Sequence, residues 1–309
     1  MTGRGLLVVG DAVTDVVARH GSPIVAGVDA AADIVLRPGG SGANTAAWAA
    51  HLGADTRLLA RLGYDSSDWH LAELARSGVR PQVSVDPDHP TAVVIAMVDH
   101  SGERSMLTNR GAGGLISEHD WDPALLEGVA RLHLSGYVFF APPGLRLARA
   151  AIADAAAAGV AVSVDPASTE PLRAFGVERF TAETAAADLV IPNLDEALLL
   201  TGAPTAERAA ELLSERYGTA VVKLGARGAL AAVSGTVIAQ VAGVAADVVD
   251  TTGAGDAFAA GFLAATLRGC GEEAALEEGC RAGAACVAQV GGRPRYGLDL
   301  NRLYPIHTD

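Results

Sequence analysis

The sequence predicts an α/β protein with a mostly parallel central sheet and helices on both faces. Two observations support this fold class. Short apolar, β-branched runs alternate along the chain with Ala- and Leu-rich segments of helical length. Several of these segments end at glycine, the residue favoured just after a helix C-terminus. Strands that alternate with helices in this way are typical of a parallel sheet covered by helical layers.

The expected elements can be placed by residue range. Strands are expected at residues 6–10, 131–139, 160–166, 187–193 and 220–225. Helices are expected at residues 43–53, 144–159, 205–218 and 256–269. Residues 12–37 and 82–108 interrupt the alternation, and the second region contains expected strands at 91–98 and 103–107 joined by a turn at 99–102. We expect both regions to form a small antiparallel sheet within a single unit of 309 residues.

Composition and charge restrict the classes of function. Half of the residues are hydrophobic and 19% are charged, which is typical of a globular chain with a large core. The 36 acidic and 23 basic residues give a net charge of −13, which disfavours binding to the nucleic-acid phosphate backbone. The apolar run near residue 6 is too short for a signal peptide, and no apolar stretch is long enough to cross a membrane. We therefore expect a cytoplasmic protein with a small-molecule substrate, and neither nucleic acid nor membrane as partner.

Cysteine and histidine patterns do not indicate a metal site. Cys270, Cys280 and Cys286 lie close together in sequence without a CxxC pair. The eight histidines are scattered, without the spacing of a ligand pair. These patterns favour buried cysteines on helices over a metal or redox centre.

Residues 247–265, DVVDTTGAGDAFAAGFLAA, carry the strongest chemical signal. A strand-like run ends at Asp250, a glycine-containing turn follows, and a helix is expected to begin near Asp256. The free N–H groups and the dipole at the start of this helix form a site for an anionic oxygen, such as that of a transferring phosphoryl group. A carboxylate beside such a site can act as a base that takes a proton from an attacking hydroxyl. The alternative is that Asp256 only caps the helix.

Residues 37–65 form the second informative segment. Gly40 and Gly42 would let the backbone approach a ligand closely. Asn44 carries both a hydrogen-bond donor and an acceptor, as recognition of sugar hydroxyls requires. The alternative is a glycine-rich turn with Asn44 as a local cap. Neither segment is a GxxxxGK[ST] phosphate loop or a GxGxxG fingerprint, since Phe258 occupies the third glycine position.

Together these segments resemble the two signatures of the ribokinase-like, or PfkB, family of carbohydrate kinases. GGSGAN lies at residues 39–44 and DTTGAGDAFAAGF at 250–262. Between them, IPNLDEALLLTG (191–202) is similar to the family's Asn-x-x-Glu region, and VVKLGARG (221–228) to its nucleotide-binding strand and turn. The resemblance spans essentially the whole chain. It implies a three-layer α/β/α ribokinase-like fold in which the small antiparallel sheet is a lid that excludes water.

The resemblance also implies a role for each matching residue. The catalytic positions are Asp256 as the base and Gly253, Ala254 and Gly255 as the anion hole. The substrate-hydroxyl positions are Asp15, Gly40, Gly42 and Asn44. The nucleotide positions are Asn193, Lys223, Gly225 and Gly228. Glu196 matches the position that organises Mg²⁺ through water, and Asp250 and Thr252 match part of a K⁺ site in cation-activated members.

These matches imply an ATP-dependent sugar kinase that transfers the γ-phosphoryl group to a hydroxyl of a ribose, fructose or 2-keto-3-deoxy sugar acid. A nucleoside kinase of the same fold and a non-catalytic binding protein are the alternatives. Val13 stands where ribokinases carry Asn, which disfavours ribose, and Lys223 stands where many members carry Thr. Arg104 and Arg110 are candidates to pair with a sugar-acid carboxylate. Pairing of lids, common in the family, implies a homodimer.

Overall fold

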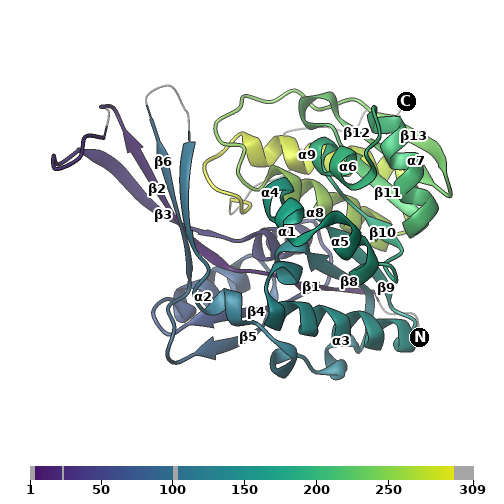
Figure 1. Ribbon diagram of the computed structural model, residues 1–309, viewed down its shortest axis with the longest axis horizontal. Coiled ribbons are helices and arrows are strands. Elements are labelled where there is room, and N and C mark those ends of the chain that lie inside the picture. Colours follow the sequence, from purple (N-terminus) through teal and green to yellow (C-terminus); the bar gives the residue numbers. More distant parts are fainter. Residues whose placement is uncertain (1–3, 23, 100–103, 296–309) are drawn as a thin grey trace.

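The computed structural model describes residues 4–22, 24–99 and 104–295, and a nine-stranded sheet forms its centre (Figure 1). The strands are Gly5–Val9 (β1), Thr56–Gly63 (β4), Arg80–Asp86 (β5), Val129–Ser135 (β8), Ala161–Asp165 (β9), Leu189–Val190 (β10), Thr219–Lys223 (β11), Ala229–Val233 (β12) and Thr236–Val241 (β13). Their order is β13-β12-β11-β10-β9-β8-β1-β4-β5. Pairing is parallel from β5 to β11 and antiparallel for β12 and β13. The predicted fold class is confirmed.

Helices cover both faces of this sheet. They are Ser41–His51 (α1), Ser67–Arg76 (α2), Pro142–Ala158 (α3), Thr169–Phe175 (α4), Val177–Glu183 (α5), Leu194–Thr201 (α6), Ala206–Tyr217 (α7), Ala254–Leu267 (α8) and Glu272–Val287 (α9). Leu6 and Val8 of β1 belong to a core cluster with α1, α2, α8 and α9. Leu7 and Val9 belong to the opposite cluster, with α3 to α7. Because β1 is buried on both faces, it appears in the sequence as an unbroken apolar run.

A second sheet forms the lid. Its strands are Val13–His20 (β2), Ala32–Gly39 (β3), Ala92–Val98 (β6) and Arg104–Asn109 (β7), in the order β3-β2-β6-β7. These strands project away from the body of the molecule (Figure 1). The sheet is mixed rather than wholly antiparallel, because β2 and β6 both leave the body in the same direction and pair in parallel. The turn expected at 99–102 lies mostly outside the described residues.

Strand β5 was not expected, and the predicted lid boundary at residue 82 falls inside it. Residues 80–86 pair with β4 and form one edge of the central sheet. An edge strand has a solvent-facing side, which allows Pro81 within it and leaves the strand without a continuous apolar run. Its sequence pattern is correspondingly weak.

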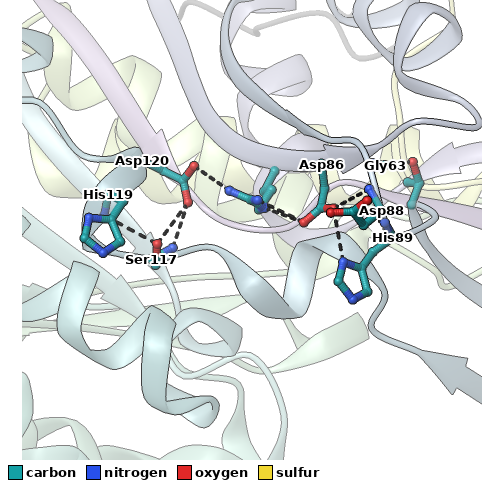
Figure 2. Close-up of polar contacts among 9 residues, drawn as sticks. Gly63, Asp86, Asp88, His89, Ser117, His119 and Asp120 are labelled. Atoms are coloured by element: carbon teal, nitrogen blue, oxygen red, sulfur yellow. Dashed lines mark hydrogen bonds and ion pairs between the residues drawn. The ribbon is translucent and has the colours of Figure 1, made fainter.

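A charged cluster beside the lid connections includes Asp86 and Asp120 (Figure 2), and Arg61 of β4 joins these two aspartates. The Arg61 guanidinium donates hydrogen bonds to Asp86 at the end of β5 and to Asp120, at 2.9 Å each. Arg61 holds the pKa of Asp86 well below its ordinary value, aided by N–H groups of Asp88 and His89. The chain after Asp86 leads into β6, and the chain between β7 and Asp120 leads back to the body. One guanidinium therefore joins the end of the strand that precedes β6 to the segment that follows β7.

Two smaller expectations concern membrane spans and cysteines. Across the ranges that the structure describes, no helix is long and apolar enough to cross a membrane. Cys280 and Cys286 are buried on α9, as expected, whereas Cys270 is exposed between α8 and α9.

Candidate active site

A cavity of about 1030 Å³ lies between the lid and the carboxyl ends of the central strands. All residues that the resemblance assigns to the site line this cavity except Gly42. Gly42 packs α1 against β1, since a Cβ there would be 2.6 Å from the Cα of Gly10. Gly42 therefore allows α1 to pack closely at this point. Its contact with the site is a 3.2 Å hydrogen bond from its N–H to Asp11 Oδ1.

Asp256 is not a helix cap. Helix α8 begins after Gly253, whose φ of 77° places it in the left-handed region, and Asp256 is the third residue of the helix. Its two carboxylate oxygens accept hydrogen bonds from Ser41 Oγ and Asn44 Nδ2, each at 2.9 Å. Asn44 is likewise not a cap, because it is the fourth residue of α1. The side chain of Asn44 is 3% exposed, and its Oδ1 has no hydrogen-bond partner among the described residues, which leaves it free for a ligand.

The environment of Asp256 suits a general base. Burial raises the pKa of its carboxyl to about 7, and the Asp165 charge adds to this rise. The hydrogen bonds from Asn44 and Ser41 act in the opposite direction and limit the shift. A base with a pKa near the working pH is both available and strong enough to take a proton from a hydroxyl.

The turn before α8 has the backbone arrangement that suits an anion. Gly253, Ala254 and Gly255 line the cavity, and the first-turn N–H groups of α8 lack acceptors within the helix. Gly253 has no room for a side chain, since a Cβ there would be 2.5 Å from the Cα of Gly292. Backbone amides and Asp256 therefore meet at one end of the cavity.

Two further carboxylates and one ammonium lie near this turn. Lys223 Nζ at the end of β11 is 2.5 Å from Asp165 Oδ2 at the end of β9. Glu196 and Asn193 form a reciprocal capping box at the start of α6, with Asn193 Nδ2 2.6 Å from Glu196 Oε1. Burial and the Asp165 charge raise the pKa of Glu196 to about 7. Asp165 is a site residue that the sequence analysis missed.

Two aspartates lie at the lid end of the cavity. Asp15 of β2 packs against Gly39 of β3, where a Cβ would clash with the carboxylate. Burial and the neighbouring Asp11 charge raise the pKa of Asp15 to about 7. Burial also raises the pKa of Asp11 above its ordinary value. Asp11 was also missed, although its place shortly after β1 is a signal, because side chains at the carboxyl ends of parallel strands meet at one edge of the sheet.

The β11–β12 connection has the shape expected of a nucleotide-binding turn. Leu224 N–H donates to the Gly228 carbonyl at 2.8 Å. Gly228 has a φ of 99°, and a Cβ there would be 2.0 Å from the Val241 oxygen. Gly225 is also left-handed, with a φ of 62°. Gly228 therefore has no room for a side chain, and the left-handed backbone at Gly225 favours glycine.

Comparison with known proteins decides the family. Residues 4–295 match the pfkB family carbohydrate kinases. The chain belongs to this family. It is thus an ATP-binding phosphotransferase with an alcohol group as acceptor.

Relatives of this PfkB kinase differ in substrate. It is 32% identical over 264 residues to an ATP-dependent ribose-1-phosphate kinase of Halopiger xanaduensis, covering 82% of each chain. Its fold matches that of an adenosine kinase from Sinorhizobium meliloti with a TM-score of 0.87 and 26% identity over 98% of both chains. An E. coli protein solved in complex with ATP and Mg²⁺ shares the fold, with a TM-score of 0.82 and 23% identity over 93% of this chain and 94% of that one.

In this PfkB kinase, Asp250, predicted for the K⁺ site, lies in an irregular segment, whereas Glu196, predicted for the Mg²⁺ site, lies at the start of α6. Asp250 ends no strand, because residues 242–250 lack regular structure. Its carboxylate accepts hydrogen bonds from the N–H groups of Thr252 and Gly291, at 2.9 and 3.0 Å. Glu196 is buried and already bound by Asn193. Within the described ranges, no three His, Cys, Asp or Glu side chains gather as a metal cage.

The two candidate arginines of this PfkB kinase can be placed only in part. Arg110 lines the cavity, with its guanidinium carbon 5.9 Å from the centre of the Tyr137 ring. The side chain of Arg104 lies outside the described residues.

Proposed function

We propose that this PfkB kinase uses Mg·ATP to phosphorylate a hydroxyl group of a small sugar. The observation that carries the proposal is the position of Asp256. It is held by Ser41 and Asn44 beside the α8 N-terminus, in a cavity large enough for two substrates. A base and an anion site at one point are what an attack of a hydroxyl on a phosphoryl group requires.

In the proposed reaction Asp256 takes the proton of the acceptor hydroxyl. The first-turn amides of α8 stabilise the charge that develops on the phosphoryl oxygens. Mg²⁺, when bound, neutralises phosphate charge, and Glu196 with Asn193 would hold it through water. The turn with Gly225 and Gly228 binds the nucleotide, and Asp250 and Thr252 would contribute to a K⁺ site. Closure of the lid excludes water, which would otherwise hydrolyse ATP.

The sugar hydroxyls are bound by Asp15, Asn44, the Gly40 backbone and Asp11. These groups offer acceptors and one amide within a small volume at the lid end, as hydroxyl recognition requires. Arg110 could extend recognition to a sugar acid, so the acceptor class includes aldoses, ketoses and keto-deoxy sugar acids.

A nucleoside acceptor is the second candidate, and the inner face of the lid favours it. Beyond Asp15, the next inner row consists of Val17, Ala96 and Met106, which are cross-strand partners. This row extends the cavity by two residues along the strands, or roughly 7 Å. A nucleobase attached to the sugar would be in contact with apolar side chains in this extension, whereas without it the nucleobase would face solvent.

The outer face of the lid supports the expected homodimer. Leu36, Val16, Ile95 and Leu107 are successive cross-strand partners and form one row across all four strands, the outer lid row. Leu36 and Leu107 are 58% and 59% exposed. An apolar row of this kind is costly in water, and a second lid would cover it.

A substrate panel tests the function. ADP formation is measured with ATP, with and without K⁺, against aldoses, ketoses, keto-deoxy sugar acids and nucleosides. We expect turnover with one acceptor class in the wild type and its loss in Asp256→Asn, which should still bind ATP. Equal turnover by the two proteins on a good acceptor would disprove the role of Asp256. Ligand-dependent shifts in Tm without any ATP turnover would instead favour a binding protein.

A further inference from the structure

Lys223 is the only lysine among the 23 basic residues of the chain, the rest being arginine. It ends β11 inside the cavity, and its side chain is 11% exposed. An ammonium is a compact point charge with three rotatable donors, whereas a guanidinium is a planar fork. The one lysine side chain of this chain thus lies in the cavity.

One carboxylate contacts this ammonium, and two more act on it electrostatically. Asp165 Oδ2 lies 2.5 Å from Nζ, and Glu196 and Asp256 act on it from farther away. Burial alone would lower the pKa of Lys223, but the carboxylates outweigh burial and raise it. The side chain is therefore a permanent cation at neutral pH.

The ammonium also lies close to the turn that begins α8. A Cβ on Gly255 would be 3.4 Å from Nζ. Asp256, the residue after Gly255, is the base that must meet the acceptor hydroxyl. The phosphoryl group attacked by that hydroxyl must lie next to it, within reach of Nζ. The other cations of the cavity lining, Arg37 of β3 and Arg110 just after β7, belong to the lid side.

Asp165 is held in a fixed position. Its Oδ1 accepts the N–H of Ala167 at 2.9 Å, and Ala167 adopts a φ of 72°, which is unusual for a residue with a side chain. The other oxygen, Oδ2, is left for Lys223. A carboxylate anchored in this way directs the ammonium toward one place in the cavity.

We propose that Lys223 binds the γ-phosphoryl group of ATP during transfer and that Asp165 is its positioning residue. The proposal rests on the proposed function. As the acceptor oxygen bonds to the γ-phosphorus, its proton goes to Asp256, and the bond to the β,γ-bridging oxygen breaks with its electron pair leaving on ADP. Lys223 supplies charge and hydrogen bonds and exchanges no proton.

Nucleotide binding without Mg²⁺ tests the role of Lys223. In EDTA, titration calorimetry compares ATP with ADP for the wild type and for Lys223→Met. Loss of a hydrogen bond between charged groups should weaken ATP binding about 10- to 100-fold, and ADP binding should change little. Arg227→Ala is the matched control, since it removes an exposed cation from the same turn and should leave the ATP-to-ADP affinity ratio unchanged.

A double variant guards against misfolding. Lys223→Met leaves Asp165 buried without its counter-ion, so Asp165→Asn/Lys223→Met removes both charges and should show the same selective loss of ATP affinity. Unchanged ATP affinity in both variants, or equal losses for ATP and ADP, would overturn the proposal. Absence of phosphoryl transfer to any acceptor would instead count against the proposed function, so the two failures can be told apart.

The single lysine permits a direct measurement as well. Protein labelled with ¹⁵Nζ-lysine should give one side-chain signal that shifts with ATP and not with ADP. In Asp165→Asn the ammonium should lose its proton at a lower pH than in the wild type, because the carboxylate that raises its pKa has gone. An unchanged titration would refute the positioning role of Asp165.

Discussion

Ser41→Ala tests the environment of the Asp256 carboxylate. Ser41 Oγ donates to Oδ1 of Asp256 at 2.9 Å and so stabilises the charged form of a carboxyl whose pKa burial raises to about 7. A hydrogen bond to a charged group is worth about 1.5–3 kcal/mol, and each pKa unit corresponds to about 1.4 kcal/mol. Its removal should raise the pKa of Asp256 by roughly 1–2 units. Asn44 still holds the other oxygen at 2.9 Å, so the carboxylate should stay in place.

The assay is the pH profile of kcat/KM for ADP formation with the best acceptor of the panel. In the wild type, kcat/KM should fall about tenfold per pH unit below about pH 7. In Ser41→Ala this acid limb should move to higher pH, while the plateau at high pH stays the same. Ser77→Ala, which loses a hydroxyl bound to the Glu73 carbonyl outside the cavity, is the control. An acid limb at the same pH in all three proteins would refute the reasoning.

Three further variants test the base, the nucleotide turn and the outer lid row. Asp256→Asn should lower kcat about 10²- to 10⁴-fold. The folded-state pKa of Asp256 is raised to about 7, so the stability that its protonated form contributes at low pH is lost as pH rises through that value. Calorimetry at pH 8 should therefore show a higher Tm for Asp256→Asn than for the wild type. At pH 4 the variant should show no such increase. Gly228→Ala, at a φ of 99°, should lower the free energy of unfolding in urea by roughly 1–3 kcal/mol and weaken ATP binding. Leu36→Glu should convert a dimer to a monomer in sedimentation without loss of kcat.

Each variant has an outcome that would count against its premise. Equal Tm values for Asp256→Asn and the wild type at pH 8 would mean that the carboxylate is well solvated. Gly228→Ala with normal stability would mean that the turn can adopt another conformation. Its control is Gly269→Ala, at a left-handed glycine with open space around it, which tests backbone strain without a steric clash. An unchanged sedimentation coefficient for Leu36→Glu would place the subunit contact elsewhere or show the chain to be a monomer.

The layered fold was predictable because each central element carries its own local signal. Strand β1 is apolar at every position since helices cover both of its faces, and glycines mark helix ends such as Gly159 after α3. Strand β5 escaped prediction for the opposite reason, since an edge strand beside solvent needs no apolar run. The parallel pairing of β2 with β6 also escaped, because it depends on where both strands leave the body and not on either sequence.

The candidate site could be proposed from sequence where a motif is contiguous. Gly253 to Asp256 form a turn and a helix start within four residues, so their chemistry could be proposed from sequence. Asp165 at the end of β9 and Asp11 shortly after β1 are single carboxylates, and nothing local marks their partners. Asp165 meets Lys223, 58 positions away, and Asn44 meets Asp256, 212 positions away. Only the fold brings such pairs together.

Strand β2 has a consequence for how this protein can change. Its alternate residues face opposite ways: Asp15 and Val17 line the cavity, and Val16 between them belongs to the outer lid row. Insertion or deletion of one residue would exchange the two sets, putting a carboxylate on the outer face and a valine at its place in the cavity. Substitutions can therefore alter either face independently of the other, but the length of β2 cannot change without altering the cavity lining and the outer lid row in the same step.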